Sequence, residues 1–348
     1  MRFILSVSLL FSLNVALAGE TVIKRLAALD IGSGKTRIEV ADVAKDDGKL
    51  SIKKSYYEAS VDLKLSEDFK FNHNKFSRNI QTEAFEVLRK LKHQAEKFGP
   101  IDEYKGVATA VFREALQLDS KNTELFLEKI RRELKISIEI IPQEAEGDLG
   151  FKTGIAKSGL KADQVAAIWD SGNRSFQISD EHNIYQGQLG ASLVFYLMIE
   201  EVQKKSLAQS SSPNPISMDQ VTKLIRTIAT KIPPAPAWLT EKISTAKNNK
   251  VLGLGGSDSL FGLGKLATES FSLKLDKIWK TIQELAPLTD AELKAKGYSQ
   301  PDRAVTQLVF LYAVMQHLGI PDVTFVPILG NTQGVFLSPQ YWQVWKNK

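Results

Sequence analysis

The sequence predicts a two-domain α/β protein, and three observations support that fold class. The chain has 348 residues, more than a single hydrophobic core usually organises. Short apolar runs typical of strands alternate with segments of helical periodicity. A strand that leads into Asp-x-Gly and then into a second strand occurs at Asp30 and again at Asp170. Because the repeat recurs about one domain length later, it indicates two related halves with a boundary near residues 142–150.

The first half is expected to open with a three-stranded meander, followed by alternating helices and strands. The residues Ile80, Ala84, Leu88 and Leu91 repeat at helical spacing, and Gly99-Pro100 ends that helix. Asn122 is expected to cap a second helix, and Pro142 to end a strand. The strands predicted in this half cover residues 22–29, 36–43, 49–57, 106–110 and 136–141.

The second half is expected to repeat the strand pattern and then become largely helical. Strands are predicted at 165–169, 176–179 and 185–189, and another at 251–256 interrupts a helical region that covers most of 192–320. The Ser- and Pro-rich segments 209–215 and 232–236 are predicted loops. We therefore expect an N-terminal domain over residues 19–145 and a C-terminal domain with added helices over residues 146–348.

The composition narrows the possible functions. Hydrophobic residues make up 43% and charged residues 24%, the balance of a globular protein rather than a disordered one. The net charge of +5 is too small a surplus to indicate nucleic-acid binding. The absence of cysteine excludes disulfides, thiolate catalysis and cysteine-ligated metal sites. The four scattered histidines argue against a multi-histidine metal site.

The first eighteen residues are predicted to be a signal peptide. Arg2 supplies positive charge, residues 3–13 are apolar, and Ala16-Leu17-Ala18 has the small-x-small form of a cleavage site. The apolar run is too short to span a membrane. We therefore expect cleavage before Gly19, export to the periplasm or the medium, and a mature chain without a membrane segment. The alternative is a buried N-terminal helix.

The glycine-containing segments are candidate phosphate-binding loops. The first contains Gly-Lys-Thr, but Leu29 stands where a P-loop needs its first glycine, and a strand rather than a helix follows. What remains is a hairpin whose backbone N–H groups could surround an anion, with a plain turn as the alternative. The first segment covers residues 30–36. The second, residues 170–175, has the same pattern, and the third, residues 253–257, lies between a strand and a helix. The candidate phosphate-binding residues are Gly32, Ser33, Gly34, Lys35, Gly172, Asn173, Arg174, Ser175, Gly255, Gly256 and Ser257.

A few charged residues complete the candidate site. Arg113 lies where a strand passes into a helix, so it could bind phosphate with two hydrogen bonds or pair with a nearby carboxylate. Glu144 and Glu146 begin a predicted helix, where a carboxylate either offsets the helix dipole or orients an attacking water. Asp30 and Asp170, each at the end of a strand, could hold a metal directly or through water.

These segments, in this order, resemble the exopolyphosphatase and guanosine-pentaphosphate phosphatase (Ppx/GppA) family, a branch of the superfamily of actin, sugar kinases and actin-like chaperone ATPases. LDIGSGKTRIEVADV and IWDSGNRSFQIS are similar to its two phosphate loops, ATAVFREA to its arginine segment, and GLGGSDSL to its later glycine loop. IIPQEAEGDLGF is similar to the segment with the catalytic glutamate, at Glu146. The resemblance runs from about Leu26 to Leu337.

The resemblance implies an actin-like (ribonuclease H-like) fold, with two βββαβαβα lobes and the substrate in the cleft between them. It implies Mg²⁺-assisted hydrolysis of a phosphoanhydride by a water that Glu146 positions. Arg113 and the hairpin amides would hold the terminal phosphate, and Asp30 and Asp170 would hold the metal. For an exported protein the expected substrate is polyphosphate. A homodimer is consistent with the family, and neither nucleic acid nor a membrane is expected as a partner.

The sequence departs from the family pattern in both loops. Asn173 and Arg174 replace two glycines, Gln177 replaces a glutamate, and Gly34 and Lys35 stand where asparagine and serine are usual. The pocket is therefore more positive and has fewer carboxylates. The departures favour an alternative function, a catalytically impaired protein that binds or senses phosphate or polyphosphate. A third possibility is an actin-like assembly protein, because a fold does not fix a function.

Overall fold

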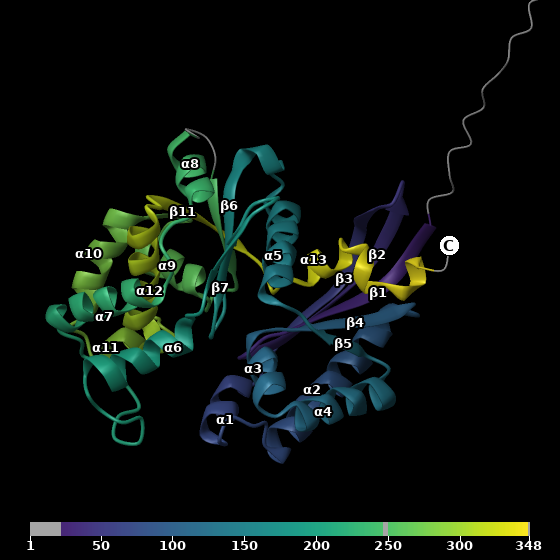
Figure 1. Cartoon of the computed structure of the whole chain (residues 1–348), viewed down its shortest axis with the longest axis horizontal. Helices are drawn as coiled ribbons and strands as arrows, with labels where there is room; N and C mark the ends of the chain where they lie inside the picture. Colours follow the sequence, from purple (N-terminus) through teal and green to yellow (C-terminus); the bar gives the residue numbers. More distant parts are fainter. Residues whose placement is uncertain (1–21, 246–249, 347–348) are drawn as a thin grey trace, which may run out of the picture.

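The computed structural model describes residues 22–245 and 250–346 and arranges them as two α/β lobes joined side by side (Figure 1). Each lobe is built on one β-sheet covered by helices, so the α/β class and the two-part organisation are confirmed. The predicted signal peptide lies outside the described residues. Within the described ranges, no helix combines the length and hydropathy that a bilayer crossing requires.

The first lobe contains a five-stranded sheet in the order β3-β2-β1-β4-β5. The first three strands form the predicted antiparallel meander, and β4 and β5 continue the sheet in parallel with β1. The strands are β1 (Val22–Ile31), β2 (Lys35–Asp46), β3 (Lys49–Asp62), β4 (Glu103–Ala108) and β5 (Ser137–Ile140). The helices of this lobe are α1 (Leu65–Phe71), α2 (Arg78–Ala95), the short η1 (Glu96–Phe98), α3 (Ala110–Leu118) and α4 (Ser120–Leu134).

Two details of the first lobe bear on the sequence predictions. Helix α2 buries Ile80, Ala84, Leu88 and Leu91, the residues whose spacing predicted it. The expected cap at Asn122 is wrong, because α4 begins two residues earlier, at Ser120. The Asn122 amide instead donates to the Phe76 carbonyl at 3.2 Å, since that carbonyl lies within reach of the first turn of α4.

The second lobe repeats the arrangement with a six-stranded sheet in the order β10-β11-β9-β6-β7-β8. Strands β6, β7 and β8 form an antiparallel meander, and β9 and β11 extend it in parallel with β6. The strands are β6 (Val165–Ser171), β7 (Phe176–Ser179), β8 (Ile184–Gly187), β9 (Lys250–Gly255), β10 (Ser272–Lys274) and β11 (Asp322–Pro327). The helices are η2 (Ala162–Gln164), α6 (Ala191–Tyr196), the π-helical η3 (Leu197–Val202), α7 (Met218–Lys231), α8 (Ala237–Thr245), α9 (Leu260–Thr268), α10 (Leu275–Leu285), α11 (Asp290–Ala295) and α12 (Pro301–Leu318).

Helix α5 (Gln143–Ser158) joins the lobes, and a stripe of glycines lets the second sheet approach it closely. A Cβ added to Gly147 would lie 2.9 Å from the Ile184 side chain, and one added to Gly154 would lie 2.5 Å from Ile168. Gly150, between them, faces Asp170 at ordinary contact distance. The glycines therefore bring the end of β6, which carries Asp170, against the helix that carries Glu146.

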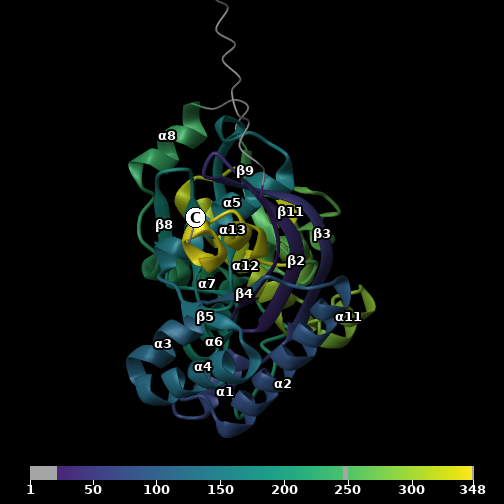
Figure 2. The same ribbon diagram turned by 90° about the vertical axis from the view of Figure 1, so that its right-hand side faces the viewer.

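The C-terminal segment returns from the second lobe to the first. Helix α13 (Thr332–Phe336), η4 (Pro339–Tyr341) and η5 (Gln343–Trp345) pack their aromatic side chains on one face of the first sheet. Helix α13 contacts α5 and the strands β1 and β2, and Figure 2 shows α13 close to α5. Residues 332–345, which the sequence grouped with the second domain, thus form part of the core of the first lobe. The return also carries Asn331 into the space between the two sheets.

Candidate functional site

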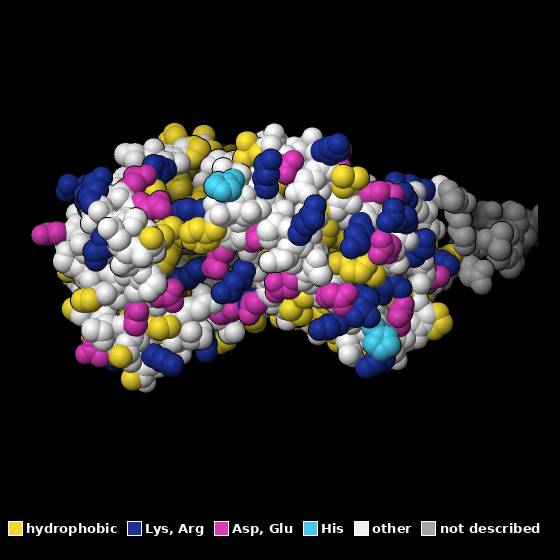
Figure 3. Space-filling view, turned by 90° about the horizontal axis from the view of Figure 1, so that it is seen from below, with side chains coloured by type: hydrophobic (Ala, Val, Ile, Leu, Met, Phe, Trp, Pro, Cys, Tyr) yellow, Lys and Arg dark blue, Asp and Glu magenta, His cyan; other side chains and the backbone are white. Residues whose placement is uncertain are grey.

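A cavity of about 790 Å³ lies between the lobes, where the loops that follow β1, β6, β9 and β11 come together. The face of the molecule seen in Figure 3 carries basic and acidic side chains in close alternation. All the predicted phosphate-binding and metal-binding residues, and Glu146, line this cavity. Arg113 is the one predicted site residue that does not. The paired Asp-x-Gly pattern therefore predicted residues that share one cavity.

The two predicted loops are the same tight hairpin built twice. In the first, the Gly32 amide donates to the Lys35 carbonyl at 2.9 Å, and in the second the Gly172 amide donates to the Ser175 carbonyl at 2.9 Å. These two amides hold their own turns, so the glycines shape the hairpins and their N–H groups do not face a ligand. The third loop, with Gly255, Gly256 and Ser257, passes from β9 toward the N-terminus of α9.

The carboxylates of Asp30 and Asp170 meet at the floor of the cavity, and Asn331 connects them. The Asn331 backbone amide donates to Asp30 Oδ2 at 3.0 Å, while its side-chain amide donates to Asp170 Oδ2 at 2.6 Å. Arg37 Nη1 lies 3.5 Å from Asp30 Oδ2. Burial raises the pKa of Asp170 to about 6, against the lowering effect of the Asn331 hydrogen bond, and the nearby Asp30 raises it further.

This floor has the chemistry of a Mg²⁺ site completed by a substrate. It offers two buried carboxylates, and the buried Asn331 Oδ1 is an acceptor without a hydrogen-bond partner. Mg²⁺ prefers oxygen ligands and is commonly held by one or two carboxylates together with substrate phosphates and water. Among the described residues, no group of three or more His, Cys, Asp or Glu side chains is placed to hold an ion without such help. The oxygen-only donor set fits Mg²⁺.

Glu146 lies in the first turn of α5, as predicted, and Arg113 holds it. Arg113 Nη1 donates to Glu146 Oε2 at 2.8 Å and to the Ile141 carbonyl at 3.0 Å. Burial raises the pKa of Glu146 to about 7, Arg113 opposes that rise, and the charge of Asp170 adds to it. A buried carboxyl that titrates near neutral pH suits a general base. Arg113 therefore orients Glu146 from behind the cavity wall. It does not line the cavity, which differs from the direct binding of phosphate that was expected for it.

The side chains that depart from the family pattern reach across the cavity to the opposite lobe. Arg174 forms a two-pronged ion pair with Glu114 of α3, with Nε 2.5 Å from Oε1, and its Nη1 donates to Ser66 Oγ at 3.1 Å. Lys35 Nζ lies 2.7 Å from Asp258 of the second lobe and 2.9 Å from Asp62.

The remaining three departures, Gly34, Asn173 and Gln177, make contacts within or between the two hairpins. The Asn173 side chain fills the space next to Gly34, where a Cβ would lie 2.3 Å from its Nδ2. Gln177 points away from this contact and donates to Ser175 Oγ at 3.3 Å within its own hairpin. Of the substitutions in the second loop, Asn173 and Arg174 therefore contact the first lobe, and Gln177 does not.

Sequence reasoning missed Asn331, Arg37 and Arg303, all of which line the cavity. Gly330 and Asn331 follow β11 at the same edge of the second sheet as the loops after β6 and β9, and β11 was not among the strands predicted from the sequence. Gly330 is needed for close approach, because a Cβ there would lie 2.6 Å from Asp30 Oδ2. The position of Arg303 on α12 gave no comparable signal.

Parts of this chain are similar in sequence to known proteins. Residues 43–179 match the model of the Ppx/GppA phosphatase family, a range that includes Arg113, Glu146 and the second loop. The chain is 29% identical over 154 residues to the bifunctional 3-dehydroquinate synthase/phosphatase of Fusobacterium nucleatum, a match that covers 44% of this chain and 22% of that protein. The chain thus spans about a fifth of that relative's length.

Two solved structures share the fold over most of their length. The Ppx/GppA enzyme of Aquifex aeolicus has a TM-score of 0.65 and 19% identity, over 91% of this chain and 99% of that one. An exopolyphosphatase of Cytophaga hutchinsonii has a TM-score of 0.66 and 14% identity, over 90% and 96% of the two chains. At these identities the likeness shows the fold: two actin-like lobes with the cavity between them.

Proposed function

We propose that this chain, whose residues 43–179 match the Ppx/GppA phosphatase family model, is a phosphoanhydride hydrolase that releases terminal phosphate, with polyphosphate as its substrate. The single observation that carries the proposal is the buried Glu146–Arg113 pair at the wall of a cavity that the two phosphate-loop hairpins also line. Export across the inner membrane is part of the proposal, since residues 1–18 have the signal-peptide pattern.

In the proposed reaction, the residues of this chain act on a water and on the terminal phosphoryl group. Glu146, deprotonated, accepts the proton of the attacking water, and Arg113 holds the carboxylate in place. The water oxygen forms a bond to the terminal phosphorus while the bond from that phosphorus to the bridging oxygen breaks, and the shortened polyphosphate leaves. The cations Lys35 and Arg37 on the cavity wall offset charge on the phosphoryl oxygens during this displacement. When bound by Asp30 and Asp170 with Asn331, Mg²⁺ would supply further neutralisation of phosphate charge.

A binding or sensing function is the second candidate, and the contact between the hairpins favours it. Asn173 packs against Gly34, and Arg174 lies at the cavity wall in place of glycine. Both side chains occupy volume where bare backbone would leave room for a phosphate. In that case the protein would bind polyphosphate tightly and release no phosphate with any divalent metal.

Phosphate release by the mature chain, residues 19–348, distinguishes the two functions. We would test long polyphosphate, pyrophosphate, ATP and guanosine pentaphosphate with Mg²⁺, Mn²⁺ or EDTA. The Glu146→Gln variant is expected to lose release while retaining its thermal unfolding transition. Glu144→Gln is the matched control, because Glu144 lies in the same helical turn, bonds Gln186 and does not line the cavity. Equal release by Glu146→Gln and the wild type would remove Glu146 from the mechanism.

A further inference from the structure

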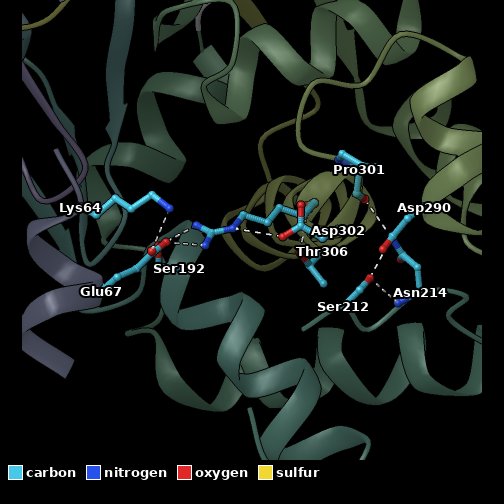
Figure 4. A network of polar contacts seen from close by, with 10 residues as sticks. Lys64, Glu67, Ser192, Ser212, Asn214, Asp290, Pro301, Asp302 and Thr306 are labelled. Carbon is cyan, nitrogen blue, oxygen red and sulfur yellow. Dashed lines mark hydrogen bonds and ion pairs between the residues drawn. The ribbon is translucent and has the colours of Figure 1, made fainter. Parts of the chain in front are cut away.

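Two arginines of the second lobe, Arg174 and Arg303, each bind a carboxylate of the first lobe. Arg174 pairs with Glu114, and Arg303 Nη2 lies 2.8 Å from Glu67 Oε1. We call Arg174 and Arg303 the arginine pair, and Glu114 and Glu67 the acidic pair. Figure 4 shows Lys64 and Glu67 of the first lobe next to Ser192 of the second, with Asp302 and Thr306 farther along the same network. These contacts connect the lobes across one side of the cavity.

Helix α1 is the element on which these contacts converge. It supplies Ser66 to Arg174 and Glu67 to Arg303, and its Lys70 lies 3.1 Å from Glu200 of η3. The ring of Phe69, also in α1, lies under the Arg174 guanidinium at 5.8 Å. Helix α1 is therefore held against the second lobe at one side of the cavity by polar contacts that an anion can replace.

Both arginines, with Glu67, belong to the cavity wall that the predicted phosphate loops also form. A guanidinium binds carboxylate and phosphate oxygens with the same two-pronged geometry, so a phosphate can replace either carboxylate. The released carboxylates would return to water readily, because Glu114 is 36% exposed and Glu67 is 31% exposed. Arg303 would keep Asp302, at 3.6 Å, as a second partner.

We propose that the arginine pair is a distal anion site of the cavity, which the acidic pair occupies until an extended polyphosphate displaces it. This inference rests on the proposed function and specifies its substrate class. A ligand that ends at the catalytic centre leaves the acidic pair in place, whereas a chain long enough to reach Arg174 and Arg303 gains both guanidinium contacts. The site therefore selects long polyphosphate over pyrophosphate.

Binding to the Glu146→Gln variant tests the inference without turnover. Titration calorimetry would compare long polyphosphate with pyrophosphate at fixed salt and Mg²⁺. Adding Arg303→Gln is expected to weaken polyphosphate binding about tenfold or more, the usual effect of losing one charged hydrogen-bond partner. Pyrophosphate binding should change less than twofold. Arg303→Lys, which keeps the charge but loses the two-pronged geometry, should lie between the two.

A change in the acidic pair distinguishes the two explanations more sharply than a change in the arginine pair. Glu67→Gln removes the competitor of the ligand, so polyphosphate binding should tighten several-fold. Glu128→Gln is the control, because Glu128 pairs with Arg131 at 2.7 Å within α4, away from the cavity. Weaker polyphosphate binding by Glu67→Gln, or an equal effect of Arg303→Gln on both ligands, would mean that the ion pairs only hold the lobes together.

The outcome of this experiment is separate from that of the proposed function. Selective polyphosphate binding that responds to Arg303 and Glu67, together with no phosphate release from chains that retain Glu146, would refute the hydrolase and support the distal site. Phosphate release with no difference in affinity between long polyphosphate and pyrophosphate would support the hydrolase and refute the distal site. Failure of the folded Glu146→Gln variant to bind either probe would also refute the distal site.

Discussion

Replacing Arg113 with glutamine should move the pH dependence of the proposed hydrolysis. Arg113 is the group that most lowers the pKa of Glu146, which burial raises to about 7. Two unit charges about 4 Å apart at an effective dielectric constant of about 20 interact by about 4 kcal/mol. Loss of a third to two thirds of that energy in Arg113→Gln would raise the pKa of Glu146 by about 1 to 2.

The consequence follows from the ionised fraction of the base. At pH 7 about half of the wild-type Glu146 is deprotonated, and this fraction falls to between about a tenth and a hundredth in Arg113→Gln. Activity at pH 7 should therefore fall by about 5- to 50-fold and recover as the pH rises toward 9. The acid limb of kcat/KM, measured by phosphate release between pH 5.5 and 9.5, reports the change.

Two controls protect this conclusion. Thermal unfolding must show that Arg113→Gln folds, because leaving one member of a buried ion pair alone costs about 3–5 kcal/mol. Arg131→Gln, which removes a surface pair with Glu128, should leave the profile unchanged. The reasoning is refuted when folded Arg113→Gln loses activity equally at every pH, because Arg113 would then act on the substrate and not through Glu146.

Three further predictions concern the loop, the core and the metal site. Gly190→Ala should lower polyphosphate affinity at least tenfold, because the new Cβ would lie 2.3 Å from the backbone nitrogen of Arg174 and displace the second hairpin; an unchanged affinity would contradict the packing. Trp342→Ala should lower the free energy of unfolding by about 3–5 kcal/mol in urea titrations, since this large side chain is fully buried; a loss under 1 kcal/mol would indicate that the C-terminal segment is dispensable. Mg²⁺ should raise the melting temperature at pH 8, because it is held by the carboxylates of Asp30 and Asp170. The rise should disappear below about pH 6, where Asp170 becomes protonated. A rise that does not depend on pH, or that persists in the variant with both aspartates changed to asparagine, would place the ion elsewhere.

The sequence by itself determined the hairpins, the strand meanders and the first turn of α5. These features depend on neighbours along the chain: a strand-terminal Asp30 or Asp170 followed by glycine makes the same turn wherever it occurs, and Pro142 ends one strand before the helix that carries Glu146. Asp30 ends β1 of the first sheet and Asp170 ends β6 of the second, so the repeat predicted the two loops, and only the packing of the lobes brought the two aspartates together. Local backbone rules were therefore enough to predict the loops that line the cavity.

The partners of the charged side chains were decided only by the tertiary structure. Arg113 had two possible roles in the sequence, and the packing of α3 against the start of α5 gave it Glu146 as a partner. Arg174 had no predictable direction until α3 and α1 placed Glu114 and Ser66 within its reach. Asn331 came to the two aspartates because the chain returns to the first lobe. A long side chain takes whichever charged partner the fold brings within about 3 Å, and that choice depends on residues far away in the chain.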